Sequence, residues 1–214
     1  MRRLVSLALA YLAGAIPFSN VLAAWISGVD LRQVGSGTVS GSGLYRVAGF
    51  KPLAVAGSLD VAKGAIVAAF ARRPAPRAAV GGGLRSPTVD EALAAGLVVV
   101  GHNWSPFLDG AGGRGVSPAL GAYGVIAPEG TVLLLAGLVA GRLTHQTALG
   151  TFASQVAIVP TLAATRGRRG ALAGAAVVGP MLLKRVMGNG PPKPGSGPRV
   201  YLARLLYDRD DWVA

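Results

Sequence analysis

The feature that most restricts this chain is a pair of long stretches without a charged side chain. Leu4–Val29 contains none, and Leu143–Thr165 is interrupted only by His145. About 20 consecutive apolar residues are enough to cross the hydrocarbon core of a bilayer. Only 14% of the residues are charged, whereas a soluble domain usually has about a quarter. The sequence therefore predicts an integral membrane protein.

Further apolar segments make the pattern polytopic. Counting the two long stretches, we expect membrane segments near 3–26, 53–71, 89–104, 116–128, 130–142, 147–165 and 170–187. Glycine and alanine dominate them, and such small residues let membrane helices approach closely. No alternation of polar and apolar residues is long enough to indicate a barrel. The predicted fold is an all-α membrane bundle of about seven transmembrane segments, joined by glycine-rich loops.

The charge distribution limits the partners. The formal net charge is +12, but the basic residues stand in short clusters between apolar segments, as is typical of helix ends that meet anionic headgroups. We therefore expect a lipid bilayer as partner and no nucleic acid, with some arginines left to hold an anionic substrate. There is no cysteine, and the two histidines are far apart, so we expect no metal site.

Two loops are rich in glycine. One is "GAGGRG" at Gly110–Gly115, and the other is "GSGTVSGSG" at Gly35–Gly43, followed by Arg46. Without a Cβ, consecutive N–H groups can converge on one anion, and Arg114 adds a permanent cation. The first loop precedes an apolar segment, so a helix N-terminus there would also favour phosphate. The alternative is a flexible turn; we predict a phosphate site at Gly112, Gly113, Arg114 and Gly115.

Three ionisable residues fall within or at the ends of apolar segments. His102 closes the third segment, where it is either a general base for a hydroxyl group or a histidine that caps the helix. Asp60 and Lys63 are three positions apart in the second segment and can meet on one helix face. Ionisable groups in membrane segments are usually functional. We expect a pair that positions Lys63 near phosphate, with a purely structural ion pair as the alternative.

The ordered motifs resemble a known family. "YLAGAIPFSNVLA", "GSGTVSGSGLYRVAG", "LDVAKG" and "GHNWSPFLDGAGGRGVSPALG" are similar to the membrane glycerol-3-phosphate acyltransferases that use acyl phosphate, the PlsY family. The resemblance implies a seven-helix, multi-pass protein of the cell (inner) membrane with its active site facing the cytoplasm. It implies transfer of an acyl chain from acyl phosphate to glycerol 3-phosphate, giving lysophosphatidic acid for phospholipid synthesis, without a metal or other cofactor.

The resemblance and the residue chemistry together give the candidate site. The candidate catalytic residues are Ser36, Arg46 and His102. The candidate phosphate-binding residues are Lys63, Gly112, Gly113, Arg114 and Gly115. A small excess of lysine and arginine on the side of the two glycine-rich loops favours that side as cytoplasmic.

Several positions depart from the family pattern. Where the family has polar residues in its later motifs, this chain has Ala148, Gly179, Leu182 and Gly190. This loss motivates a second hypothesis, a catalytically reduced relative that binds anionic phospholipid or a phosphorylated metabolite. A transporter of an anionic metabolite ranks last, because the halves show no inverted repeat. We expect an acyltransferase-like membrane domain over 1–190 and a flexible tail over 191–214 with a short surface helix.

Overall fold

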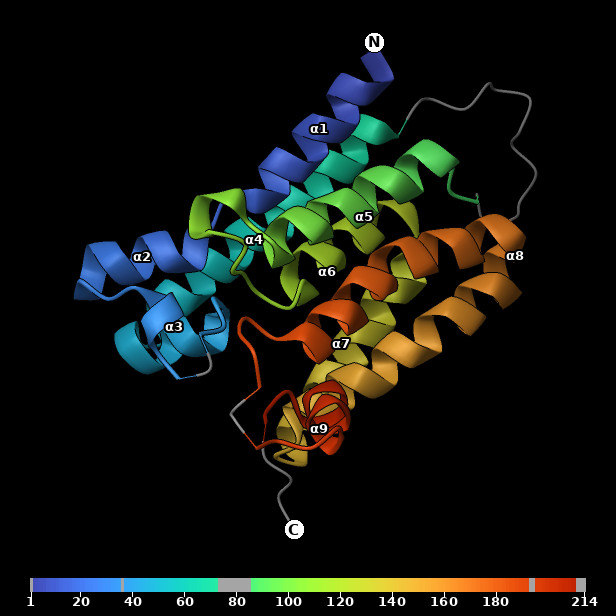
Figure 1. Ribbon diagram of the computed structural model, residues 1–214. Helices are drawn as coiled ribbons and strands as arrows, with labels where there is room; N and C mark the ends of the chain where they lie inside the picture. The colour runs from blue at the N-terminus through green and yellow to red at the C-terminus, as the bar shows by residue number, and fades with distance from the viewer. Residues whose placement is uncertain (1, 36, 73–85, 193–194, 211–214) are drawn as a thin grey trace.

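The computed structural model describes residues 2–35, 37–72, 86–192 and 195–210, and these residues form helices and loops without a strand (Figure 1). The predicted all-α class is confirmed. The longer helices are α1 (Arg2–Ala15), α2 (Phe18–Ser27), α3 (Gly41–Ala48), α4 (Phe50–Ala71), α5 (Val89–Asn103), α6 (Val116–Ile126), α7 (Pro128–Leu143), α8 (Thr147–Met187) and α9 (Arg199–Tyr207). Short 3₁₀ turns, η1 (Leu31–Gln33) and η3 (Pro106–Leu108), lie in two of the loops.

The first apolar run is two helices rather than the single one expected near 3–26. Helix α1 ends at Ala15 and α2 begins at Phe18, so Ile16 and Pro17 form an unwound joint. Proline has no N–H to donate and disfavours helical geometry in the residue before it. The backbone carbonyls at the end of α1 therefore need partners from outside the helix.

Helix α8 contains the last two predicted segments. Gly167 interrupts it with non-helical backbone angles (φ 65°, ψ −159°), and Figure 1 shows the helix doubling back on itself. The arms pack closely, because a Cβ on Gly174 in the second arm would lie 3.2 Å from the Cα of Val159 in the first. The expected segments 147–165 and 170–187 are thus two arms of one hairpin.

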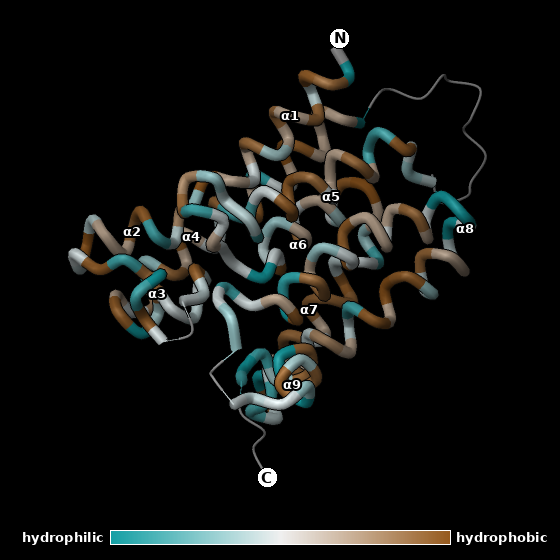
Figure 2. The backbone as a smooth tube through the Cα atoms, viewed as in Figure 1, coloured by the Kyte–Doolittle hydropathy of each residue, from teal (hydrophilic) through white to brown (hydrophobic). Residues whose placement is uncertain are grey.

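The outer surface of the bundle is strongly apolar. Trp25 is 81% exposed and Phe70 is 87% exposed, and hydrophobic residues line the helix bodies in Figure 2, whereas polar residues gather around α9 and the turn of α8. Arg3–Ser27, Phe50–Ala71 and Thr147–Met187 are long and apolar enough to cross a membrane. The other predicted segments correspond to the shorter helices α5, α6 and α7, of 15, 11 and 16 residues.

The predicted tail contains α9, which packs on the end of α8. Val200 and Ala203 are buried, and the Arg185 guanidinium donates to the carbonyl of Leu205 over 2.8 Å. Residues 193–194 and 211–214 of this tail lie outside the described residues. The domain boundary near residue 190 stays a prediction.

Glycines set the distance between neighbouring helices. A Cβ on Gly64 in α4 would strike the backbone carbonyl of Pro118 in α6, and one on Gly121 in α6 would strike the carbonyl of Val61 in α4. A Cβ on Gly101 in α5 would strike the carbonyl of Tyr11 in α1. Because backbone atoms cannot move aside as side chains do, these positions require glycine.

We expect Gly64→Ala to destabilise the protein by about 1–3 kcal/mol, the usual cost of overpacking. The matched control is Gly57→Ala in the same helix, where the added Cβ meets no atom within 4 Å. The control should be neutral or stabilising by up to about 1 kcal/mol, because alanine is the better helix former. Thermal unfolding in detergent measures both, and equal effects would contradict the role of Gly64.

Candidate active site at the broken helix

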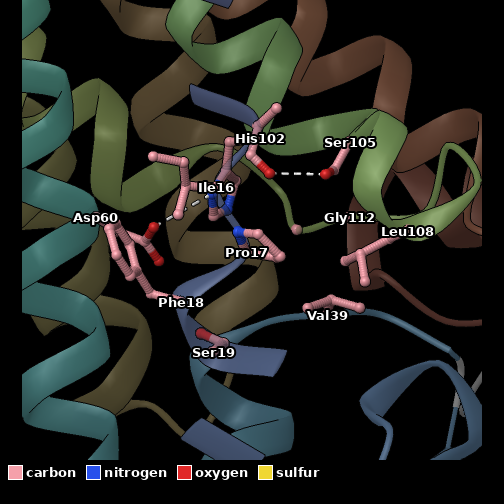
Figure 3. Close-up of a pocket in the computed structure, with 12 residues that line it drawn as sticks. Ile16, Pro17, Phe18, Ser19, Val39, Asp60, His102, Ser105, Leu108 and Gly112 are labelled. Atoms are coloured by element: carbon pink, nitrogen blue, oxygen red, sulfur yellow. Dashed lines mark hydrogen bonds and ion pairs between the residues drawn. The ribbon is translucent and has the colours of Figure 1, made fainter. Parts of the chain in front are cut away.

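A small pocket lies beside the joint between α1 and α2 (Figure 3). We call it the helix-break pocket. Its walls come from the joint, from α4, from the end of α5 and from the loop that follows α5. The residues that line it are Ala15, Ile16, Pro17, Phe18, Ser19, Val39, Asp60, His102, Ser105, Leu108, Gly112 and Gly113. Two motifs of the sequence analysis, far apart in the chain, thus meet at one place.

Lys63 satisfies the carbonyls that the helix break exposes. Its buried ammonium donates to the carbonyls of Gly14 over 2.8 Å and Ile16 over 2.9 Å. It also lies 2.7 Å from a carboxylate oxygen of Asp60. The predicted pairing of Asp60 and Lys63 is therefore present, but the ammonium is directed at the helix joint and does not line the pocket. Direct contact of Lys63 with a phosphate stays a prediction.

His102 stands between this ion pair and the glycine-rich loop. Its Nδ1 lies 3.2 Å from the Lys63 ammonium and 3.6 Å from the Asp60 carboxylate. Because an ammonium can only donate, the closer contact makes Nδ1 the acceptor and places the ring proton on Nε2. His102 then presents an N–H to its surroundings. This arrangement suits a hydrogen-bond donor to an anion rather than the general base considered from the sequence.

The loop after α5 folds back tightly on the end of that helix. The Ser105 hydroxyl donates to the carbonyl of Ala15 at the end of α1 over 2.6 Å, and the Gly113 amide donates to the carbonyl of His102 over 3.1 Å. Asn189 pins the loop from the other side, accepting from the Gly112 amide over 3.2 Å and donating to its carbonyl over 3.0 Å. The loop is therefore anchored to α1, α5 and the end of α8.

The glycines of this loop are needed for close approach rather than as converging donors. The amides of Gly112 and Gly113 already donate to Asn189 and His102, so they do not point together at one anion as we had expected. A Cβ on Gly112 would strike the backbone of His102 and Asn103, and one on Gly113 would strike the His102 ring. Gly115, with φ 75°, is the N-cap of α6.

Arg114 joins the two glycine-rich loops and the C-terminal region. Its guanidinium donates to the carbonyl of Lys184 over 2.8 Å and to the hydroxyl of Thr38 over 3.2 Å, and its Nε lies 2.7 Å from the carboxylate of Asp208. Burial raises the pKa of Asp208 against the opposing effects of Arg114 and Arg185. A carboxylate that loses this much solvation is a weak competitor for the arginine when a more strongly charged anion is present.

The remaining candidates are placed differently. Ser36 lies outside the described residues. Arg46 is exposed in the last turn of α3 and beside Gly35, where a Cβ would lie 3.4 Å from its guanidinium. Within the described parts of the chain it has no hydrogen bond or ion pair, so this arginine is available to a ligand.

Sequence reasoning missed the part of the site at the end of α8 and in α9. Lys184 and Arg185 were interpreted as a flank facing lipid headgroups, yet both are buried. Arg185 donates to the carbonyl of Ala148 over 2.9 Å and to the hydroxyl of Thr151. The signal that was available is that this basic pair directly follows an apolar segment and precedes Asn189.

Comparison with known proteins agrees with these motifs. The family model described as glycerol-3-phosphate acyltransferase matches residues 4–189. A glycerol-3-phosphate acyltransferase of Myxococcus xanthus is 38% identical over 159 residues, which cover 73% of this chain and 78% of the relative. One from Anaeromyxobacter is 36% identical over 165 residues, covering 76% and 72%. Glycerol-3-phosphate acyltransferase 4 of Dehalococcoides mccartyi is 35% identical over 132 residues, and the match spans about half of its length, 53%.

Two solved structures share the fold. The crystal structure of PlsY (YgiH), an integral membrane glycerol 3-phosphate acyltransferase, in its glycerol 3-phosphate form gives a TM-score of 0.75 at 24% identity. The lysophosphatidic acid form gives 0.73 at 23% identity. Each comparison covers 100% of this chain and 96% of the solved chain, so the similarity extends over the helices and the tail alike.

The ion pair at the helix break should respond as a coupled unit. Lys63→Met leaves the Asp60 carboxylate buried without its cation, and breaking a buried pair costs about 3–5 kcal/mol. Combining Lys63→Met with Asp60→Asn removes that isolated charge, so the double variant should be more stable than the sum of the single effects. Unfolding in detergent measures the coupling, with the exposed Lys51→Met on the same helix as control. Additive effects would show that the two residues act independently.

Proposed function

This chain belongs to the glycerol-3-phosphate acyltransferase family, and we propose that it transfers an acyl chain from acyl phosphate to glycerol 3-phosphate. The product is lysophosphatidic acid, for phospholipid synthesis. The observation that carries the proposal is the convergence of the family motifs on one polar site within an apolar bundle. His102, the glycine-rich loop, Arg114 and the joint of α1 and α2 meet there. The related PlsY structures in glycerol 3-phosphate and lysophosphatidic acid forms support it.

The proposed reaction makes limited demands on protein acids and bases. The acceptor hydroxyl attacks the acyl carbonyl carbon, the bond from that carbon to the phosphate oxygen breaks, and the phosphate leaves with the electron pair. The leaving phosphate is itself basic enough to take up the hydroxyl proton. The site therefore has to orient two anionic substrates and stabilise negative charge that develops on oxygen, for which preorganised donors are the most effective device.

The residues divide into two groups around this chemistry. Arg46, together with Ser36, is proposed to hold one phosphate from the side of the first glycine-rich loop. Arg114, carried by the loop of Gly112, Gly113 and Gly115, is proposed to hold the other. The Nε2–H of His102, fixed by Lys63 on the opposite edge of the ring, is proposed to donate a hydrogen bond to an oxygen that gains charge during the transfer.

Binding at Arg114 requires an exchange of anions. In the free protein Asp208 supplies the negative charge at 2.7 Å from Nε. A phosphate group carries up to two negative charges and three acceptor oxygens, and bidentate contacts with arginine are strong. We therefore propose that substrate phosphate replaces the carboxylate and leaves the contacts of Arg114 with Thr38 and Lys184 in place.

The proposed setting is the cell (inner) membrane. The chain is an integral membrane protein of the PlsY type with apolar helices. Exposed apolar side chains along the bundle give the acyl chain a route from the lipid. We propose that the site, at the end where α9 and the glycine-rich loops lie, faces the cytoplasm, where glycerol 3-phosphate is dissolved.

The activity test uses purified protein in lipid. We expect release of inorganic phosphate from acyl phosphate only when glycerol 3-phosphate is present, with one lysophosphatidic acid formed for each phosphate released. Several acyl chain lengths should be tried. Saturable binding of the substrates without turnover at any chain length would instead identify the catalytically reduced relative suggested by Gly179, Leu182 and Gly190.

Substitution of Arg114 tests the phosphate contact. Arg114→Ala should raise the Michaelis constant for a phosphorylated substrate about ten- to a hundredfold, because a hydrogen bond to a charged group is worth roughly 1.5–3 kcal/mol. Arg114→Lys keeps the charge and should be milder. The control is Arg142→Ala, at an exposed arginine in the last turn of α7. Unchanged constants in both Arg114 variants would reduce its role to linking the loops.

A further inference from the structure

A second and larger cavity lies on the other side of the glycine-rich loop. It has a volume of about 480 Å³ and opens between this loop, the end of α8 and α9. We call it the tail cavity. Its lining residues are Trp104, Asp109, Gly110, Ala111, Lys184, Met187, Gly188, Asn189, Gly190, Pro191, Pro192, Tyr201 and Arg204. Gly110 and Ala111 face the tail cavity, whereas Gly112 and Gly113 line the helix-break pocket, so one loop separates the two.

Lys184 is a buried cation in the wall of the tail cavity. The residue is only 1% exposed. Its ammonium donates to the carbonyl of Gly110 over a long 3.3 Å and lies 5.1 Å from the centre of the Trp104 ring. An ammonium has three donors, so these contacts leave most of its hydrogen-bonding capacity for something else.

The nearby carboxylates are committed to other cations. Asp109 at the cavity rim lies 2.7 Å from Arg32, Asp208 lies 2.7 Å from Arg114, and Asp210 lies 2.6 Å from Arg204. Among the described residues, no carboxylate lies within ion-pair distance of Lys184. The tail cavity therefore has an excess of positive charge.

Burying an ammonium without a counter-ion is costly, so buried charges are normally paired. Arg114 increases the demand, because its guanidinium binds the backbone carbonyl of Lys184 and brings a second cation close by. A mobile anion in the tail cavity would supply the missing partner. The volume is within the range of about 300–1,000 Å³ found for small-molecule sites.

We propose that the tail cavity is the acceptor site, and that Lys184 binds the phosphate group of glycerol 3-phosphate there. The inference rests on the proposed function and adds a division of the substrates across the glycine-rich loop. The acceptor is small and soluble in water, and the tail cavity is open, basic and walled partly by the segment after α8. The acyl donor enters from the lipid at the helix-break pocket, whose walls include Ile16, Phe18, Val39 and Leu108.

Kinetics with a matched pair of variants test this assignment. Lys184→Met removes the charge and keeps an unbranched apolar chain of similar length. We expect the Michaelis constant for glycerol 3-phosphate to rise about ten- to a hundredfold, the size of a lost charge-assisted contact, while the constant for acyl phosphate changes less than threefold. Lys51→Met, at an exposed lysine on α4, should change neither constant. Equal changes for both substrates, or none, would overturn the assignment.

Tryptophan fluorescence gives a readout that does not depend on turnover or on the variant folding. Trp104 lies against the Lys184 ammonium, so an anion drawn to that ammonium should change its emission. In protein with Trp25 and Trp212 replaced by phenylalanine, glycerol 3-phosphate and inorganic phosphate should each give a saturable change, which Lys184→Met removes. Sulfate-free buffer and sodium chloride at equal ionic strength serve as controls.

The source of the phosphate is decided by a third arm. The same protein is placed in nanodiscs of phosphatidylcholine alone or with phosphatidylglycerol. A response to phosphatidylglycerol without one to glycerol 3-phosphate would make the cavity a lipid headgroup site and overturn the proposal. If wild-type protein shows the saturable response but no acyl transfer, the proposed function fails while the anion site stands. Activity with an unaltered constant in Lys184→Met defeats the inference alone.

Discussion

The contact between the Lys63 ammonium and the broken end of α1 is the interaction on which the site depends. Pro17 interrupts the first apolar run, and the carbonyls of Gly14 and Ile16 lose their helical partners inside an apolar bundle. Such groups are costly to leave unsatisfied in a membrane. Lys63 satisfies them, Asp60 balances its charge, and His102 is oriented by the same ammonium. The unwound joint is thereby stabilised as one wall of the helix-break pocket.

The loop after α5 transfers this order to the rest of the site. It is short of side chains because it lies against the backbone of His102 and Asn103, where a Cβ has no room. Ser105 ties its start to α1, and Asn189 ties its middle to the end of α8. One face of the loop meets the helix-break pocket and the other meets the tail cavity. A bare backbone with one arginine therefore acts as a thin partition held from both sides.

Positive charge is concentrated where α8 ends. Arg114, Lys184, Arg185 and Arg204 are largely withdrawn from solvent, and α9 and the chain after it supply Asp208 and Asp210 in return. The arginines are further held by backbone carbonyls, whereas Lys184 is left without a carboxylate. This imbalance is what a site for phosphorylated substrates requires, because an anion can enter only where the protein has not already neutralised its own cations. The polar residues that the family has at Gly179 and Leu182 are replaced here by contacts from the tail.

The sequence by itself determined the membrane bundle, the glycine-rich loops and the family resemblance, because apolar length and ordered motifs are properties of contiguous residues. It also placed Asp60 and Lys63 on one helix face. Only the tertiary structure decided what those groups contact. Lys63 bonds a carbonyl 49 positions away, and Gly112 bonds Asn189 at a separation of 77. The direction of the His102 proton, the hold of Asp208 on Arg114 and the unpaired charge of Lys184 all follow from such distant partners. No local pattern contains them, because the free energy of a buried charge is set by whichever residues the fold brings beside it.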